Sequence, residues 1–294
     1  MHPPKNLGPR AFLKKLGFQF DKKPTALDRA FLMSLPVEVR DEVEDIWVRL
    51  HSGFAHISEL YSVPQNEKQA SLLFSHDASR AISTMSWFAN VVENQKPQDV
   101  LEVGCGAGYL LRFLRNRFPE TKFSGIDRQE NLLAIAAVDT ALNLHASSYE
   151  QATTKKCYDL IICDFGWDNQ DIPESQKPHS SADIAGALYC PGCSDDQIPF
   201  FSTLLDQFSR FLNEYGQIAI VGRFPHIGSI RALYLAAEKC ELHVERGGFH
   251  VIRVMNSEGT ERFPAFLITK NNSKSGSLQL EDVAALYHRD PFSS

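Results

Sequence analysis

Three glycines, separated by single residues, follow a short apolar run in the first half of the chain. Residues 99–108 read DVLEVGCGAG, with glycines at 104, 106 and 108. A strand that leads through glycines into a helix lets a ligand approach the backbone closely, and directs free N–H groups and the helix dipole at that ligand. Glu102 comes two residues before the first glycine. A carboxylate there suits a ligand with an ammonium or sulfonium group and would be awkward beside a pyrophosphate.

A second carboxylate, Asp127, lies 23 residues beyond Gly104, directly after a strand predicted over 122–126. At the end of a second strand, a carboxylate can accept hydrogen bonds from both hydroxyls of a ribose. The alternative is that Asp127 only caps a helix. The spacing G-x-G-x-G is one residue shorter than that of dinucleotide sites. This spacing and Glu102 both disfavour a nicotinamide-dependent dehydrogenase.

The stretch LEVGCGAGYL followed by FSGIDRQ resembles the class I S-adenosylmethionine-dependent methyltransferases. The resemblance covers about residues 97–270. It implies an α/β, Rossmann-like fold with a seven-stranded, mostly parallel sheet whose last strand is antiparallel, and S-adenosylmethionine as the cofactor. The residues that it assigns to the cofactor are Glu102, Gly104, Cys105, Gly106, Gly108, Asp127, Arg128, Ser147, Ser148 and Asp164.

The same resemblance implies a role for most of these positions. The glycines would surround the methionine end of the cofactor, with Glu102 near its amino group. Asp127 would bind the ribose, and Arg128 would lie beside the adenine. Ser147 and Ser148 follow the third predicted strand, where many family members have an acid that contacts the adenine. The lack of an acid at these two positions leaves open a non-catalytic protein that binds the cofactor or a partner.

Two further side chains are candidates for the chemistry itself. Asp164 ends the strand predicted over 158–163, next to where the resemblance places the methyl group. His226 follows the next predicted strand, on the same edge of the sheet. Either side chain could orient the acceptor or remove its proton, although Asp164 could also be an ordinary loop residue.

Residues 164–167 read DFGW. Family members that methylate amides or adenine amines carry an Asn/Asp-Pro-Pro-aromatic motif here, so we do not expect those acceptors. Phe165 and Trp167 either stack on a substrate or pack in the core.

Cys190-Pro-Gly-Cys193 is a C-x-x-C pair within a long polar stretch, 166–197, that we expect to be an insertion loop. A zinc site would need further ligands, such as His179 or Asp195. No predicted strand–helix unit presents the pair as thioredoxin-like proteins do, because the next helix is predicted only from 198 to 212. We therefore expect an ordinary turn and no metal.

Strand and helix patterns alternate from 97 to 270, which predicts a parallel sheet with ligands at the carboxyl ends of its strands. Before it, apolar stripes over 43–61 and 72–92 predict an N-terminal helical region, 1–96, that could cap a substrate pocket. Residues 271–294 are expected to form a tail.

The composition of the 294 residues, with 43% hydrophobic and 22% charged side chains, is that of a folded protein. Lys and Arg number 30 against 36 Asp and Glu, giving a net charge of −6, which disfavours structured RNA as the acceptor. The six cysteines fit a reducing cytoplasm better than a disulfide framework, and no apolar run reaches the ~18 residues of a membrane span. The sequence predicts a methyltransferase acting on a small-molecule or protein acceptor. It leaves the oligomeric state open.

Overall fold

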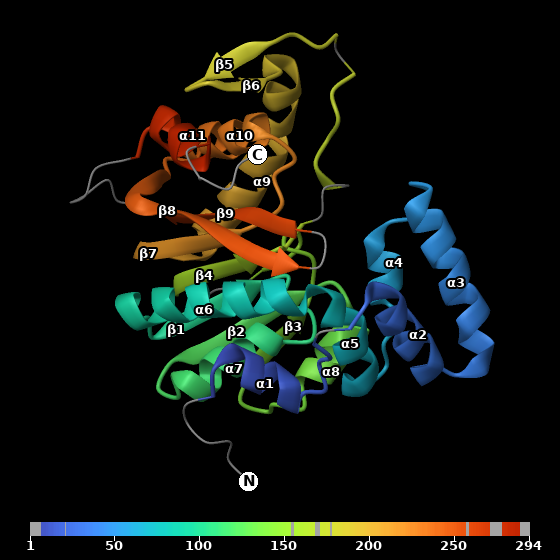
Figure 1. Cartoon of the computed structure of the whole chain (residues 1–294). Coiled ribbons are helices and arrows are strands. Elements are labelled where there is room, and N and C mark those ends of the chain that lie inside the picture. Colours follow the sequence, from blue (N-terminus) through green and yellow to red (C-terminus); the bar gives the residue numbers. More distant parts are fainter. Residues whose placement is uncertain are drawn as a thin grey trace. The chain divides into compact units, whose positions relative to one another are not determined.

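The structure is a computed structural model (Figure 1). It describes residues 7–20, 22–153, 156–167, 171–176, 178–256, 259–270 and 278–288. The first part of the predicted tail, 271–277, and the last residues, 289–294, lie outside the described residues. No helix in the described ranges is long and apolar enough to cross a membrane.

The seven strands of the main sheet have the order β3-β2-β1-β4-β7-β9-β8. Their bounds are β1 (Asp99–Val103), β2 (Lys122–Asp127), β3 (Asn143–Ala146), β4 (Tyr158–Asp164), β7 (Leu212–Val221), β8 (His243–Asn256) and β9 (Gly259–Thr269). Strand β4 pairs in parallel with β1 and with β7, and β2 pairs in parallel with β3. Strand β9 runs antiparallel to β7. The predicted α/β fold, with an antiparallel last strand and preceding helices, is confirmed.

The chain divides into two compact units. The first unit comprises Met1–Lys96, Cys105–Ser147 and Val254–Gly259, and the second comprises Pro97–Gly104, Ser148–Arg253 and Thr260–Ser294.

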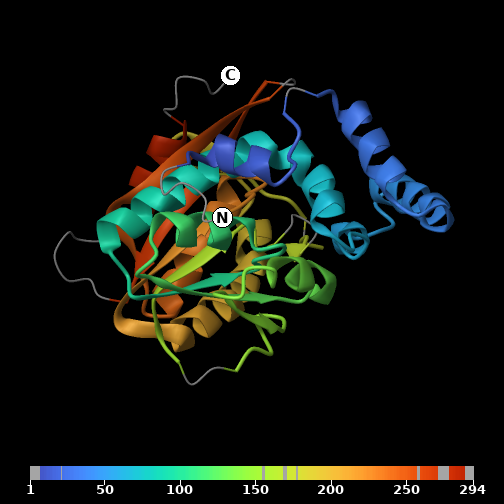
Figure 2. The same ribbon diagram turned by 90° about the horizontal axis from the view of Figure 1, so that it is seen from below.

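The first unit contains the N-terminal helices and the elements that follow the glycine motif. Its helices are α1 (Pro9–Lys15), α2 (Pro24–Ser34), α3 (Val37–His51), α4 (Ile57–Tyr61), α5 (Glu67–Leu73), α6 (Ala78–Gln95), α7 (Tyr109–Arg117) and α8 (Glu130–Ala136). Helix α1 lies against α6 and α7 (Figure 2), and the Phe12 and Phe113 rings are 5.5 Å apart.

Each apolar stripe of the N-terminal region spans more than one helix. The first stripe covers α3 and α4, which are separated near Gly53, a residue with a positive φ of 73°. The second covers α5, a 3-10 turn over Phe74–Asp77, and α6, which ends at the left-handed Lys96. The spacing of apolar residues shows which face of a helix is buried. The same spacing can continue across a break when both helices bury that face in the same core.

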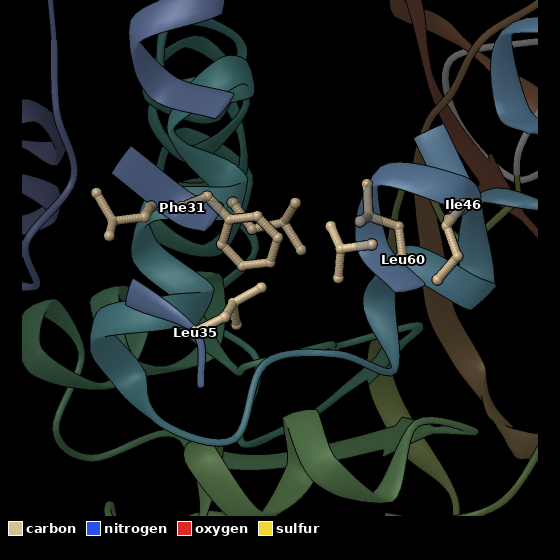
Figure 3. Close-up of a cluster of buried hydrophobic side chains, with 7 residues drawn as sticks. Phe31, Leu35, Ile46 and Leu60 are labelled. Atoms are coloured by element: carbon tan, nitrogen blue, oxygen red, sulfur yellow. The ribbon is translucent and has the colours of Figure 1, made fainter. Parts of the chain in front are cut away.

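That core brings together four of the N-terminal helices. Figure 3 shows the labelled side chains Phe31, Leu35, Ile46 and Leu60, which come from α2, the residue after α2, α3 and α4. Leu72 and Leu73 of α5 complete the cluster together with Val43. Because these helices are short, we expect most of their stability to come from this shared burial rather than from helix propensity.

The second unit contains β1, β4 and β7 to β9, together with a small hairpin and three helices (Figure 1). The hairpin is β5 (Ala182–Ile184) with β6 (Ala187–Tyr189), and the helices are α9 (Pro191–Phe211), α10 (Ile227–Lys239) and α11 (Leu280–His288). The stretch 166–197, which we predict to be an insertion loop, thus contains this hairpin and the first turns of α9. Helix α9 begins at Pro191 rather than at 198, because proline suits the first turn of a helix and the buried Ser194 and Gln197 continue its packed face.

Candidate functional site

In the first unit, a carboxylate ties the glycine motif to the end of β2. Asp127 ends this strand, and its Oδ2 accepts a hydrogen bond from the backbone N–H of Gly106 at 2.7 Å. Its Oδ1 accepts one from the backbone N–H of Gln129 at 2.8 Å. The backbone N–H of Arg128 is a third donor to this carboxylate. Because a carboxylate has about four acceptor positions, these backbone donors do not use all of them.

The surroundings of Asp127 set its charge state. Burial raises the pKa of this carboxyl above the ordinary 3.8, although the N–H groups of Gln129 and Gly106 act in the opposite direction. A partly buried carboxylate that already holds backbone donors is stabilised further by additional donors, such as hydroxyl groups.

The three glycines of the motif have positive φ angles, 76° at Gly104, 50° at Gly106 and 68° at Gly108. A Cβ on Gly108 would lie 2.8 Å from the Cβ of Ala136, so this glycine allows α7 to start close to α8. A Cβ on Gly106 would meet only Leu132 Cδ1, at 3.8 Å. Of the two motif glycines in the first unit, Gly106 is therefore the one with room beside it for a ligand.

Other predicted cofactor residues in this unit already serve the fold through their backbone or side chain. Cys105 is buried and donates its N–H to the Ile126 carbonyl at 3.1 Å. A Cβ on Gly125 would lie 2.6 Å from the Cys105 sulfur, which shows how tightly this thiol packs. Ser147 donates its N–H to the Asp127 carbonyl at 2.9 Å, and Arg128 is exposed.

Two polar side chains that the sequence analysis did not single out connect this region to the N-terminal helices. Gln129 Nε2 donates to the Ser58 carbonyl in α4 at 3.1 Å. Asn131 Nδ2 donates to the carbonyls of Tyr61 at 3.0 Å and Pro64 at 2.8 Å. The segment directly after Asp127 is therefore held against α4 and the turn that follows it.

In the second unit, the predicted residues lie at the carboxyl ends of neighbouring parallel strands. Glu102 lies in β1 opposite Ile162 of β4, and it is only 3% exposed. Asp164 ends β4 opposite Val221 of β7. Burying a carboxylate such as Glu102 is costly unless donors or a positive charge compensate it, so this position favours a cationic group nearby.

The chain segments that leave β1 and β4 approach each other closely within this unit. A Cβ on Gly104 would lie 3.0 Å from the Gly166 Cα, and a Cβ on Gly166 would lie 2.6 Å from the Cys163 sulfur. Gly166 also faces the Val103 carbonyl, 3.2 Å from where its Cβ would be. The glycine in DFGW therefore allows this crossing, a role that its spacing in the sequence does not reveal.

The two aromatic residues around Gly166 behave differently. Trp167 is buried, with its ring edge-on to Phe201 and Phe224 at 5.7 Å each, so it packs in the core. Phe165 is half-buried and has a φ of 53°, in the left-handed region that a non-glycine residue rarely adopts. Its ring lies edge-on to Phe263 at 5.0 Å. Such strain directly after a strand is typical of functional sites.

Two remaining predicted residues occupy turns of the second unit. His226 is the N-cap of α10 and is exposed, and desolvation of its ring lowers the pKa of the imidazole. The neutral imidazole that this favours is the form able to accept a proton. The Ser148 carbonyl accepts hydrogen bonds from the N–H groups of Gln151 and Ala152.

Comparison with known proteins adds direct evidence on the family. A family model described as a methyltransferase domain matches residues 100–185, a range that runs from β1 into the β5 segment. Residues 100–185 are thus similar to a methyltransferase domain. The resemblance of the glycine motif to the class I S-adenosylmethionine-dependent methyltransferases is thereby confirmed.

Curated proteins that are similar to part of this chain carry the name malonyl-[acyl-carrier protein] O-methyltransferase. The protein from Priestia megaterium is 29% identical over 94 residues, which are 30% of this chain and 34% of the relative. The protein from Bacillus anthracis is 26% identical over 159 residues, 52% of this chain and 55% of the relative. The match thus spans about a third to just over half the length of these curated relatives.

Among solved structures, the magnesium protoporphyrin IX methyltransferase of Synechocystis, with bound SAM, aligns with a TM-score of 0.43 at 10% identity. The alignment covers 67% of this chain and 82% of that chain.

The C-x-x-C pair lies beyond the matched range 100–185. Contrary to our prediction, a strand and a helix do flank it. Strand β6 leads directly to Cys190, which is the N-cap of α9, so a strand–helix unit does present the pair. The backbone N–H groups of Cys193 and Ser180 lower the pKa of the Cys190 thiol to about 6. His179 Nδ1 lies 3.2 Å from the Cys193 sulfur. The expectation of an ordinary turn is therefore wrong.

Proposed function

We propose that this chain binds S-adenosylmethionine and transfers its methyl group to a small-molecule or protein acceptor. The observation that carries the proposal is the Asp127 carboxylate at the end of β2, which the backbone N–H groups of Gly106 and Gln129 hold beside the glycine motif. The methyltransferase-domain match over 100–185 supports the same reading.

Taken one at a time, each unit holds residues that suit part of this cofactor in charge or in space. When bound, S-adenosylmethionine supplies a methyl group already activated on a cationic sulfur. Asp127 would accept hydrogen bonds from the ribose hydroxyls, while the space beside Gly106 leaves room for the methionine end of the cofactor. The buried Glu102 would favour the positive charges of that end. Arg128, Ser147 and Ser148 remain the candidates for contact with the adenine.

Because the methyl group is activated, the main tasks of the protein are to align the acceptor and to exclude water. Asp164, at the end of β4, and Phe165, with its strained backbone, are our candidates for holding the acceptor. His226 has a lowered pKa and could accept a proton from a weakly nucleophilic acceptor.

For the acceptor, we propose a cavity of about 470 Å³ within the N-terminal helices. Most of its lining is apolar or aromatic, including Phe31, Trp47 and Leu50. One polar pair lies in the wall, where His76 Nε2 is 2.9 Å from the Asp28 carboxylate. A pocket with an apolar lining and few polar groups fits a largely apolar acceptor oriented by one polar end. The names of the relatives, which specify a malonyl group on a carrier protein, make a carrier-bound acyl group one acceptor to test.

The decisive experiment is incubation of the full chain with S-adenosylmethionine labelled in its methyl group and a cell extract. We expect label to enter a metabolite or a protein, and the Asp127→Ala variant to transfer far less under the same conditions. No transfer by well-folded protein that still binds S-adenosylhomocysteine would favour a non-catalytic cofactor-binding protein. Label entering structured RNA would contradict the proposed acceptor class.

For the location, we propose a reducing cytoplasm. None of the six cysteines, all of which belong to the described ranges, forms a disulfide. Cys163 and Cys105 are buried as free thiols in the core, as cytoplasmic proteins permit.

A further inference from the structure

Three side chains with nitrogen or sulfur ligand atoms converge in the second unit, and none of them is assigned to the cofactor. His179, Cys190 and Cys193 have ligand atoms that all lie within 4.8 Å of one another. His179 comes from the segment before β5, whereas the two cysteines belong to the N-cap and first turn of α9. Residues distant in sequence thus present one imidazole and two thiols to the same point.

The backbone around the two cysteines holds their sulfur atoms in place. Cys190 is the N-cap residue and Pro191 fixes the first helical position, so Cys193 follows on the same side of the first turn. The N–H groups of Cys193 and Ser180 donate to the Cys190 sulfur. These donors fix the Cys190 sulfur at the start of the helix, on the side where Cys193 lies.

The polar residues next to the three ligands bind other partners. Asp195, which the sequence offered as a fourth ligand, pairs instead with Arg231 at 2.6 Å. Ser194 is fully buried, and its Oγ donates to the Gly228 carbonyl at 2.7 Å. Asp196 lies one turn beyond Cys193 and accepts a hydrogen bond from Ser175 Oγ at 2.6 Å. Its carboxylate adds negative charge beside the cluster.

We propose that His179, Cys190 and Cys193 form a zinc-binding site that nothing in the methyltransferase fold requires. Two thiolates and one imidazole are ligands that Zn²⁺ prefers, whereas Mg²⁺ and Ca²⁺ prefer oxygen atoms. Zinc in proteins is usually four-coordinate, so water or the nearby Asp196 carboxylate would take the fourth position. Metal binding would displace the thiol protons and leave the oxidation state of sulfur and metal unchanged.

The position of the site gives it a structural consequence. The zinc would fix the segment around His179 to the start of α9. Ser194 and Arg231 already connect that helix start to α10, through the Gly228 carbonyl and the Arg231 to Ser194 hydrogen bond of 2.9 Å. Helix α10 begins directly after His226. The metal would therefore steady the turn that carries one candidate catalytic side chain.

The test is the metal content of the full chain, purified under reducing conditions without chelator and then dialysed against zinc chloride and metal-free buffer. We expect about one zinc per chain by elemental analysis. Cys190→Ser, Cys193→Ser and His179→Ala should each lower the zinc content at least about tenfold, because each removes one of three ligands. The matched control is Cys157→Ser, which removes an exposed cysteine elsewhere and should keep full zinc content.

A second measurement keeps the proposal testable if a cysteine variant misfolds. Replacing zinc by Co²⁺ in the wild-type chain should give a thiolate-to-cobalt charge-transfer band, and His179→Ala, whose side chain is exposed, should weaken it. Wild-type protein that takes up neither metal would overturn the proposal. The same holds if the variants keep the zinc of the wild type, or if the two thiols form a disulfide even in reduced preparations. The zinc site does not depend on the proposed methyl transfer, because none of these results requires an acceptor.

Discussion

At the scale of single residues, Asp127 is central, because its two oxygens accept hydrogen bonds from the N–H of Gly106, in the glycine motif, and from the N–H of Gln129, after β2. Asp127→Asn removes the charge and turns an amide NH₂ toward one of these N–H groups. We expect cofactor affinity to fall about 10- to 100-fold, as for the loss of a hydrogen bond to a charged group. Calorimetry with S-adenosylhomocysteine measures this. Asp206→Asn, which changes a carboxylate paired with Arg210 on the surface, is the control. Affinity within twofold of the wild type would refute the role.

Asp127 also predicts how binding depends on pH. Because burial raises its pKa in the folded chain above 3.8, the stability that it contributes is complete below the unfolded pKa and is lost as the pH rises through the folded pKa. Ligand hydroxyls favour the charged form, so affinity should fall on acidification, starting at a higher pH than for an ordinary aspartate. The dissociation constant measured from neutrality towards pH 4 should show this limb in the wild type. If the Asp127→Asn variant shows the same loss of affinity on acidification, a group other than Asp127 causes it.

At the scale of elements, the crossing of the segments after β1 and β4 depends on the absence of a side chain at Gly166. A Cβ there would lie 2.6 Å from the sulfur of Cys163, which is fully buried. We expect Gly166→Ala to lower the free energy of unfolding by about 1 to 3 kcal/mol, as overpacked cores do. Urea unfolding measures the difference. Gly8→Ala is the control, because no heavy atom lies within 4 Å of its Cβ position. Equal midpoints for both variants would show that the crossing relaxes freely.

Buried parallel strands were readable from the sequence because they are short apolar runs, as in 158–163, and the glycine motif was readable because its spacing is local. The start of α9 was not readable, since Cys190-Pro-Gly-Cys193 and the residues after it resemble a loop. Only packing shows that Ser194 is buried on the helix. The core position of Trp167 and the approach of His179 to the two thiols likewise depend on tertiary structure.

At the scale of the whole molecule, we propose that the cofactor binds at residues around the glycine motif and that the acceptor binds in the cavity of the N-terminal helices. Leu50→Trp should fill the cavity and lower methyl transfer about tenfold, which corresponds to ~1.4 kcal/mol, while affinity for S-adenosylhomocysteine stays unchanged. Val48→Trp, at an exposed position of the same helix α3, should leave both unchanged. Equal loss of transfer in the two variants would contradict this assignment of the cavity.

Binding of the cofactor by the intact chain is the most direct test of the central claim. Titration calorimetry on folded protein should give one site per chain for S-adenosylmethionine and for S-adenosylhomocysteine, and no binding of NADH. Absence of heat with both sulfur nucleosides, or binding of NADH in their place, would contradict the account.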